Sequence, residues 1–188
     1  MNYTEGAHFR AKDYSKNVLT RGEYEDCIFE DCNLTNANLG SIVFVECEFI
    51  NCDLSNANIS RAAFREVRFK GCKMLGLRFE TVNNFLFSVW FEECRLDSSV
   101  FYQCPLKGTT FSRCSLKDVD FGEADLSESI FDEAELGGAI FENTNLGKSD
   151  FSSAVNYIID PQQNIISQAR FSKTNLAGLL TRYDLVLE

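Results

Sequence analysis

Eight cysteines are the residues of this chain best suited to metal or redox chemistry, and Cys27 and Cys32, like Cys47 and Cys52, are five residues apart. A structural zinc site needs four ligands that converge from loops. All eight thiols instead lie two positions before a large apolar residue, where a thiol acts as a compact apolar filler. We therefore expect buried, reduced cysteines in a cytoplasmic protein, with no metal and no cofactor.

Other catalytic or binding chemistry has little support in the sequence. The chain has one histidine, His8, and neither a Gly-rich phosphate loop nor a nucleophile motif. Its net charge of −10 repels the phosphates of nucleic acids and anionic lipid surfaces. It contains neither a signal peptide nor a membrane-spanning run. We expect no enzyme activity, no small-molecule substrate, and neither nucleic acid nor membrane as a partner.

The elements that position these side chains follow a repeat of five residues. From Phe9 to Phe79 every fifth residue is large and apolar, and a second series, shifted by two residues, runs from Phe91 to Phe151. A mostly small residue stands two places before each, so every unit has two inward and three outward side chains. Neither the helix period of 3.6 nor the strand period of 2 fits this pattern.

Residues twenty apart are alike, as in the series Phe9, Phe29, Phe49 and Phe69, so four units complete one coil. This predicts an all-β, right-handed, four-sided solenoid of seven coils, roughly 34 Å long at the usual strand spacing of about 4.8 Å. We expect the solenoid over residues 1–153, with a register break near 82–90. Residues 154–188 should form an irregular final coil, a C-terminal helical cap and a dimerisation segment.

Several units resemble the A(D/N)LXX motif of the pentapeptide repeat proteins, for example Ala37-Asn38-Leu39, Ala57-Asn58-Ile59 and Ala124-Asp125-Leu126. The resemblance covers about residues 7 to 153 and implies the right-handed quadrilateral β-helix. It also implies a function, because the Qnr-type quinolone-resistance members of this family bind DNA gyrase and topoisomerase IV as dimers that imitate duplex DNA.

Charge is distributed unevenly along the predicted rod. Residues 1–80 carry 12 acidic and 10 basic residues, whereas residues 81–154 carry 13 and 5. Between residues 118 and 150 the chain has ten acidic residues and a single basic residue, Lys148. We expect the partner-binding acidic surface to consist of Asp118, Asp120, Glu123, Asp125, Glu128, Asp132, Glu133, Glu135 and Glu142.

Two apolar segments interrupt the repeat. In the register break, Phe85, Phe87 and Trp90 either form an exposed contact cluster or pack over the seam. Near the C-terminus, Ser172 can cap a short amphipathic helix, followed by a strand-like apolar end. This end either only closes the last coil or also forms a homodimer. The dimer interface would then consist of Leu176, Leu179, Leu180, Tyr183, Leu185 and Leu187.

These observations favour a non-catalytic, dimeric DNA mimic whose carboxylates stand in for phosphates and whose partner is a type II topoisomerase such as DNA gyrase. It would modulate the enzyme or protect it from quinolones. The alternative is a generic protein-binding scaffold of unknown partner, which would be recognised through Phe85, Phe87 and Trp90.

Overall fold

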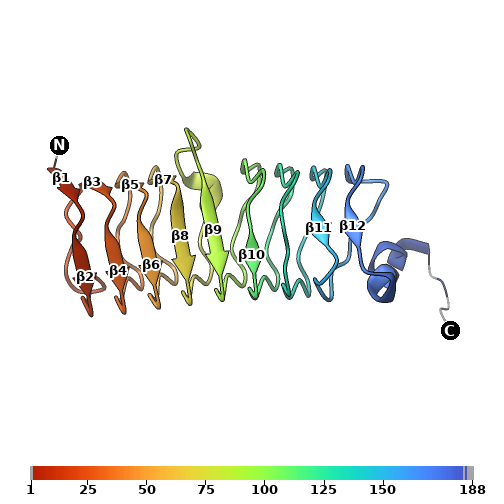
Figure 1. The fold of residues 1–188 in the computed structure, drawn as a ribbon, viewed down its shortest axis with the longest axis horizontal. Helices are drawn as coiled ribbons and strands as arrows, with labels where there is room; N and C mark the ends of the chain where they lie inside the picture. Colours follow the sequence, from red (N-terminus) through yellow and green to blue (C-terminus); the bar gives the residue numbers. More distant parts are fainter. Residues whose placement is uncertain (1, 184, 186–188) are drawn as a thin grey trace.

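The computed structural model describes residues 2–183 and 185, and shows a straight rod with the two ends of the chain at opposite ends (Figure 1). Each coil has four sides, and every paired strand is parallel to its neighbour in the next coil. We number the faces in chain order: the first is centred on Phe9, the second on Tyr14, the third on Leu19 and the fourth on Tyr24. The structure is therefore the four-sided parallel β-solenoid that the repeat predicts.

Regular strands occur on two of the four faces. The second and third faces are held by isolated bridges, such as Asp53 to Lys73 and Asn38 to Asn58. The fourth face carries β1 (Asn2–Glu5), β3 (Gly22–Glu25), β5 (Val43–Val45) and β7 (Ala63–Arg65). The first face carries β2 (His8–Arg10), β4 (Ile28–Glu30), β6 (Glu48–Ile50), β8 (Val67–Lys70), β9 (Val89–Glu92), β10 (Phe111–Ser112), β11 (Asp150–Phe151) and β12 (Arg170–Phe171).

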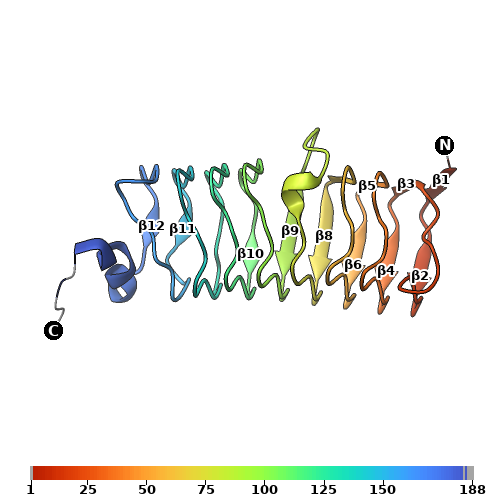
Figure 2. The same cartoon turned by 180° about the vertical axis from the view of Figure 1, so that it is seen from behind.

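The pairing register confirms four units per coil and locates the break. Strand partners are twenty residues apart before and after the break, as in Phe49 with Phe69, but Val67 pairs with Val89, twenty-two residues away. A short 3₁₀ helix, η1 (Phe79–Thr81), precedes the extra residues, and the loop rises above the row of fourth-face strands (Figure 2). The solenoid has about eight turns: the seven predicted coils are followed by a final coil in which Phe171 continues the first-face stack.

The centre of each unit is a buried apolar side chain, and aromatic rings stack from coil to coil. On the first face the ring centroids are 4.7 Å apart between Phe29 and Phe49 and 5.4 Å apart between Phe151 and Phe171. Offset-stacked rings contribute about 0.5–1.5 kcal/mol beyond their buried area. Repetition of this contact in every coil makes the interior column continuous along the rod.

The second aromatic column changes face at the break. Before it, Tyr24 and Phe44 of the fourth face stack at 5.8 Å. After it, Phe101 and Phe121 of the third face stack at 5.4 Å, and leucines occupy the fourth-face centres. Phe79 lies at the transition, 6.4 Å from the ring of Phe87. The two extra residues therefore coincide with a rearrangement of the interior.

The corners between faces require a left-handed backbone. Among the described residues, twenty-three non-glycine residues have positive φ, nearly all of them two positions after an inward centre, for example Asn36 and Asn56. This conformation is unfavourable for β-branched residues and tolerable for Asn, Asp and Gly. Side chains one position before a centre often accept the backbone N–H two residues on, as Asn58 does from Ser60. The polar composition of the outward positions thus has a structural cause.

All eight cysteines are buried and unpaired, as the repeat predicts. Six of the thiols donate to carbonyl oxygens of the preceding coil, for example Cys52 Sγ to the oxygen of Phe29 at 3.2 Å. Burial raises the pKa of the Cys47 and Cys104 thiols to about 12. Ser99 occupies an equivalent position and makes the same kind of bond, from Oγ to the oxygen of Met74 at 2.8 Å. Small side chains at this position therefore link adjacent coils.

The C-terminal segment covers the last coil but is not the amphipathic α-helix that the spacing predicts. It forms two 3₁₀ helices, η2 (Lys173–Leu179) and η3 (Thr181–Tyr183), with a non-helical residue at Asn175. The Asn175 amide donates to the oxygen of Ala154, and this contact with the rung beneath replaces a regular helix. Ser172 does accept the N–H of Thr174, as expected of a cap. Of the predicted terminal strand, residues 186 and 187 lie outside the described residues.

Two further observations concern membranes and metals. None of the described helices is long and apolar enough to span a bilayer. Within residues 2–183 and 185, no group of three or more His, Cys, Asp or Glu side chains is placed to hold a metal ion.

Replacing Cys52 with alanine should lower the free energy of unfolding by about 1–2 kcal/mol, because it leaves a small cavity and removes the acceptor of the Cys32 N–H. Replacing it with serine should cost less, since serine makes the same inter-coil bond elsewhere in the chain. Urea unfolding measures both variants. An equal loss of unfolding free energy in the alanine and serine variants, or stoichiometric zinc in the purified protein, would contradict the packing role of Cys52.

Replacing Gly178 with alanine should detach the cap, because a Cβ there would overlap the carbonyl oxygen of Tyr157. The oxygen of Gly178 also accepts the N–H of Ile159 at 3.0 Å. Hydrogen exchange should accelerate at Ile159 and in the last coil, with the first coils unchanged. Ala177→Gly, at the neighbouring position, is the control; unchanged exchange in the Gly178 variant would show that the cap does not depend on this contact.

Candidate interaction surfaces

The nine predicted acidic residues are all at least partly exposed, but they do not share one face. Asp120 and Glu142 lie on the third face, Asp125 on the fourth, Asp132 on the first and Glu135 on the second, as the bridges and repeat register show. The remaining four occupy the corners. The structure thus brings the nine together as a ring around the rod, which we call the acidic collar: Asp118, Asp120, Glu123, Asp125, Glu128, Asp132, Glu133, Glu135 and Glu142.

Part of the collar also holds its own turns. One carboxylate oxygen of Asp120 accepts the N–H of Gly122 at 2.8 Å, and one of Asp125 accepts the N–H of Ser127 at 3.1 Å. Hydrogen bonds from Tyr102 and Gln103 lower the pKa of Glu123. These carboxylates therefore both hold the turns and form part of the exposed surface.

The three aromatic residues of the break differ in their exposure to solvent. Phe85 is 66% exposed, Phe87 is half-buried against the core, and Trp90 stands half-buried on β9. The guanidinium of Arg65 lies 5.6 Å from the ring centre of Phe85, and that of Arg68 lies 5.5 Å from Trp90. Phe87 therefore packs over the seam, whereas Phe85 and Trp90 keep exposed surface, and a contact role for them stays a prediction.

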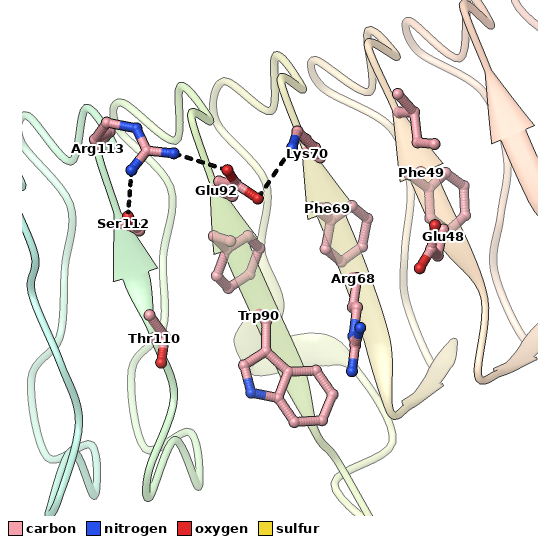
Figure 3. A pocket seen from close by; sticks show the side chains of 12 residues that line it. Glu48, Phe49, Arg68, Phe69, Lys70, Trp90, Glu92, Thr110, Ser112 and Arg113 are labelled. Carbon is pink, nitrogen blue, oxygen red and sulfur yellow. Dashed lines mark hydrogen bonds and ion pairs between the residues drawn. The ribbon is translucent and has the colours of Figure 1, made fainter.

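A groove of about 580 Å³ runs beside Trp90 on the first face, across β6, β8, β9 and β10 (Figure 3). Its upper wall is a network in which Glu92 binds Arg113 at 2.7 Å and Lys70 at 3.3 Å. Its lower wall holds Arg68 and Trp90 side by side. Cations and carboxylates are almost balanced there, so this groove has no strong preference for a charged partner.

A second acidic surface lies on the corner between the fourth and first faces, which the charge count of the first half does not suggest. Asp26, Glu46 and Glu66 occupy the same corner in three successive coils, all with positive φ. Glu23 and Glu25 lie beside them on β3, and Glu48 on β6. We call these six residues the acidic edge. Among the described residues, none of the six forms an ion pair.

The chain matches the family model of the pentapeptide repeat region over residues 19–83, 42–107 and 83–151. The chain belongs to the pentapeptide repeat family. Full-length QnrB1, a plasmid-mediated fluoroquinolone resistance protein, is 14% identical, with 98% of this chain and 100% of that chain covered and a TM-score of 0.55.

A further solved structure is HetL, a pentapeptide repeat protein involved in heterocyst differentiation regulation from the cyanobacterium Nostoc sp. strain PCC 7120. It is 17% identical, with 90% of this chain and 86% of that chain covered and a TM-score of 0.47. No curated protein sequence gives a significant match. At such identities the likeness to QnrB1 describes the fold alone.

In a pentapeptide repeat protein, the signal that reveals the acidic edge is the coil period rather than the net charge. Asp26, Glu46 and Glu66 are twenty residues apart, so they form a column. The basic residues of the same coils, such as Arg61 and Lys73, lie at other corners or faces of the coil. Counting charges along the chain averages these positions and conceals the column.

The C-terminal residues predicted to form a dimer fall into two groups. Leu179 packs against the core and contributes to the cap, and Leu180 is half-buried. Leu176, Tyr183 and Leu185 are 41%, 48% and 55% exposed. Leu187 lies outside the described residues. Only the exposed group is available for contact with another chain.

Proposed function

We propose that this pentapeptide repeat protein is a non-catalytic, homodimeric DNA mimic that binds DNA gyrase or topoisomerase IV and modulates the enzyme or protects it from quinolones. The observation that carries the proposal is the acidic collar on a straight rod of regular cross-section. The fold shared with QnrB1, a fluoroquinolone resistance protein, is consistent with the proposal.

The collar supports the proposal through its charge density. Residues 118 to 142 make up less than two coils, so the nine carboxylates lie within roughly 10 Å of the rod axis. Duplex DNA carries about six phosphates over that length. Because the carboxylates surround the rod, a basic, saddle-shaped surface meets negative charge wherever it contacts the collar. Such fields accelerate association and weaken as salt rises.

A second candidate function, a protein-binding scaffold of unknown partner, is favoured by the loop of the break. Phe85 and Leu86 are 66% and 63% exposed, and Trp90 and Arg68 lie nearby. Exposed aromatic and arginine side chains are typical of residues that dominate the energy of protein interfaces. Partner binding that is insensitive to salt and is lost in Trp90→Ala would favour this function over DNA mimicry.

The charge prediction concerns the collar as a whole. Converting Asp120, Glu123, Asp125, Glu128, Asp132 and Glu133 to their amides removes six charges from the net −10. The amides retain an oxygen for the turn hydrogen bonds, so the fold should persist. Binding to purified gyrase in low salt should weaken by about tenfold or more, mainly in the association rate, and the difference should shrink as salt rises.

A matched control removes the same number of charges outside the collar and the acidic edge, and should weaken gyrase binding much less. The readouts are a supercoiling assay and association kinetics. If both sets behave alike, or if the wild-type protein has no effect on gyrase, the DNA-mimic proposal is wrong. The control set, also converted to amides, is Asp13, Glu30, Asp31, Asp53, Glu80 and Asp97.

The dimer prediction uses the exposed group at the C-terminus. Replacing Leu176 and Tyr183 with serine removes apolar contact area but leaves Leu179 and Gly178 against the last coil. We expect light scattering to report a monomer of unchanged fold, whereas deletion of residues 173–188 should also expose the last coil and promote aggregation. A stable dimer after both changes would place the interface elsewhere.

A further inference from the structure

The acidic edge borders an apolar groove that neither the collar nor the cap explains. A depression of about 740 Å³ lies between the loop of the break and the fourth face, with Val45, Leu86, Phe87 and Trp90 among its lining residues. Glu23, Glu25 and Glu66 form its acidic rim. Its floor is therefore largely apolar and its rim negative.

The groove continues around the corner toward the first face. A smaller depression of about 170 Å³ is lined by Asp26, Glu46, Glu48 and Glu66, together with Trp90. Glu66 and Trp90 line both depressions, so the two are contiguous. The six residues of the acidic edge thus line one continuous surface, which ends at Trp90, one coil after Glu66.

The basic side chains at this surface are held by aromatic rings rather than by the carboxylates. Arg65 stacks on Phe85 and Arg68 on Trp90. The Nε of Arg65 is shielded from solvent and has no hydrogen-bond acceptor among the described residues. The two guanidinium groups therefore position the rings and leave the edge carboxylates without cationic partners.

Like charges stacked coil upon coil repel one another. Asp26, Glu46 and Glu66 are spaced by one rung, about 4.8 Å. At that separation exposed like charges repel one another in water, and more strongly near a protein surface. A partner with basic side chains relieves this repulsion, and its apolar side chains bury Leu86 and the Trp90 ring.

We infer that this groove is a docking site for a basic, apolar segment of a partner protein. Charge complementarity selects the sign of the partner, because six carboxylates outnumber two ring-bound arginines. Phe85 and Leu86 are exposed and can contact apolar side chains of a protein partner. A bound divalent cation would make no such contact, so these residues favour a peptide segment over a metal ion. The inference rests on the second candidate function, the protein-binding scaffold, and deepens it by naming the chemistry of the partner; it does not depend on the acidic collar.

Trp90 is the only tryptophan of the chain and therefore reports binding directly. The probe is a short peptide of alternating arginine and leucine without tryptophan, titrated into the full-length protein in low salt. We expect a saturable change in Trp90 fluorescence. A peptide with glutamine in place of arginine should bind at least about tenfold more weakly, because the rim then gains no ionic contact.

Two sets of variants locate the site. Asp26→Asn, Glu46→Gln and Glu66→Gln together should weaken peptide binding by about tenfold. The matched control, Glu123→Gln, Glu128→Gln and Glu133→Gln, also removes three corner carboxylates at positive φ and should change it less than twofold. Leu86→Asn, which suits the positive φ at that position, should weaken binding with the fold intact.

Several outcomes would overturn the inference. Equal binding of the neutral peptide, equal effects of the edge and collar variants, or no fluorescence change would each exclude a basic partner at this groove. Saturable binding of calcium chloride that requires the same three carboxylates and displaces the peptide would assign the edge to a cation instead. The gyrase assays test the collar separately, so either proposal can fail without the other.

Discussion

Everything in this rod depends on the stacking of like side chains in successive coils. A unit of five residues cannot bury its apolar centre alone, and it does so only by resting on the same unit of the coils above and below. Phe29 on Phe49 and Phe101 on Phe121 illustrate the contact, and small inward side chains such as Cys52 donate to the backbone of the preceding coil. The termini must therefore be closed, as the segment around Gly178 does at one end.

The same periodicity governs the surface. Outward residues twenty apart form columns whose members are separated by one rung, so a charge repeated every coil becomes a line of charge. The column Asp26, Glu46, Glu66 arises in this way. The collar has a different origin, because its acids occupy different positions of consecutive units and therefore surround the rod. One repeat thus produces both a negative edge and a negative ring.

The break shows how a local change in the core reaches the surface. Moving the second aromatic column from the fourth face to the third changes the shape of the interior, and two extra residues accommodate the change. Phe87 fills the seam, while Phe85 and Leu86 are left in solvent on the loop. Two well-exposed apolar side chains therefore lie beside the carboxylates of the acidic edge, and the break brings both properties together.

The sequence by itself determined the fold, the burial of the cysteines and the site of the break, because the five-residue register decides which side chains point inward. It also identified the acids of the collar, though not their arrangement around the rod. Tertiary structure alone separated Phe85 from Phe87, placed Arg65 and Arg68 on aromatic rings, and turned the expected C-terminal helix into a kinked 3₁₀ cap. The reason is that register fixes the direction of a side chain, whereas its partners are set by contacts between coils and across corners.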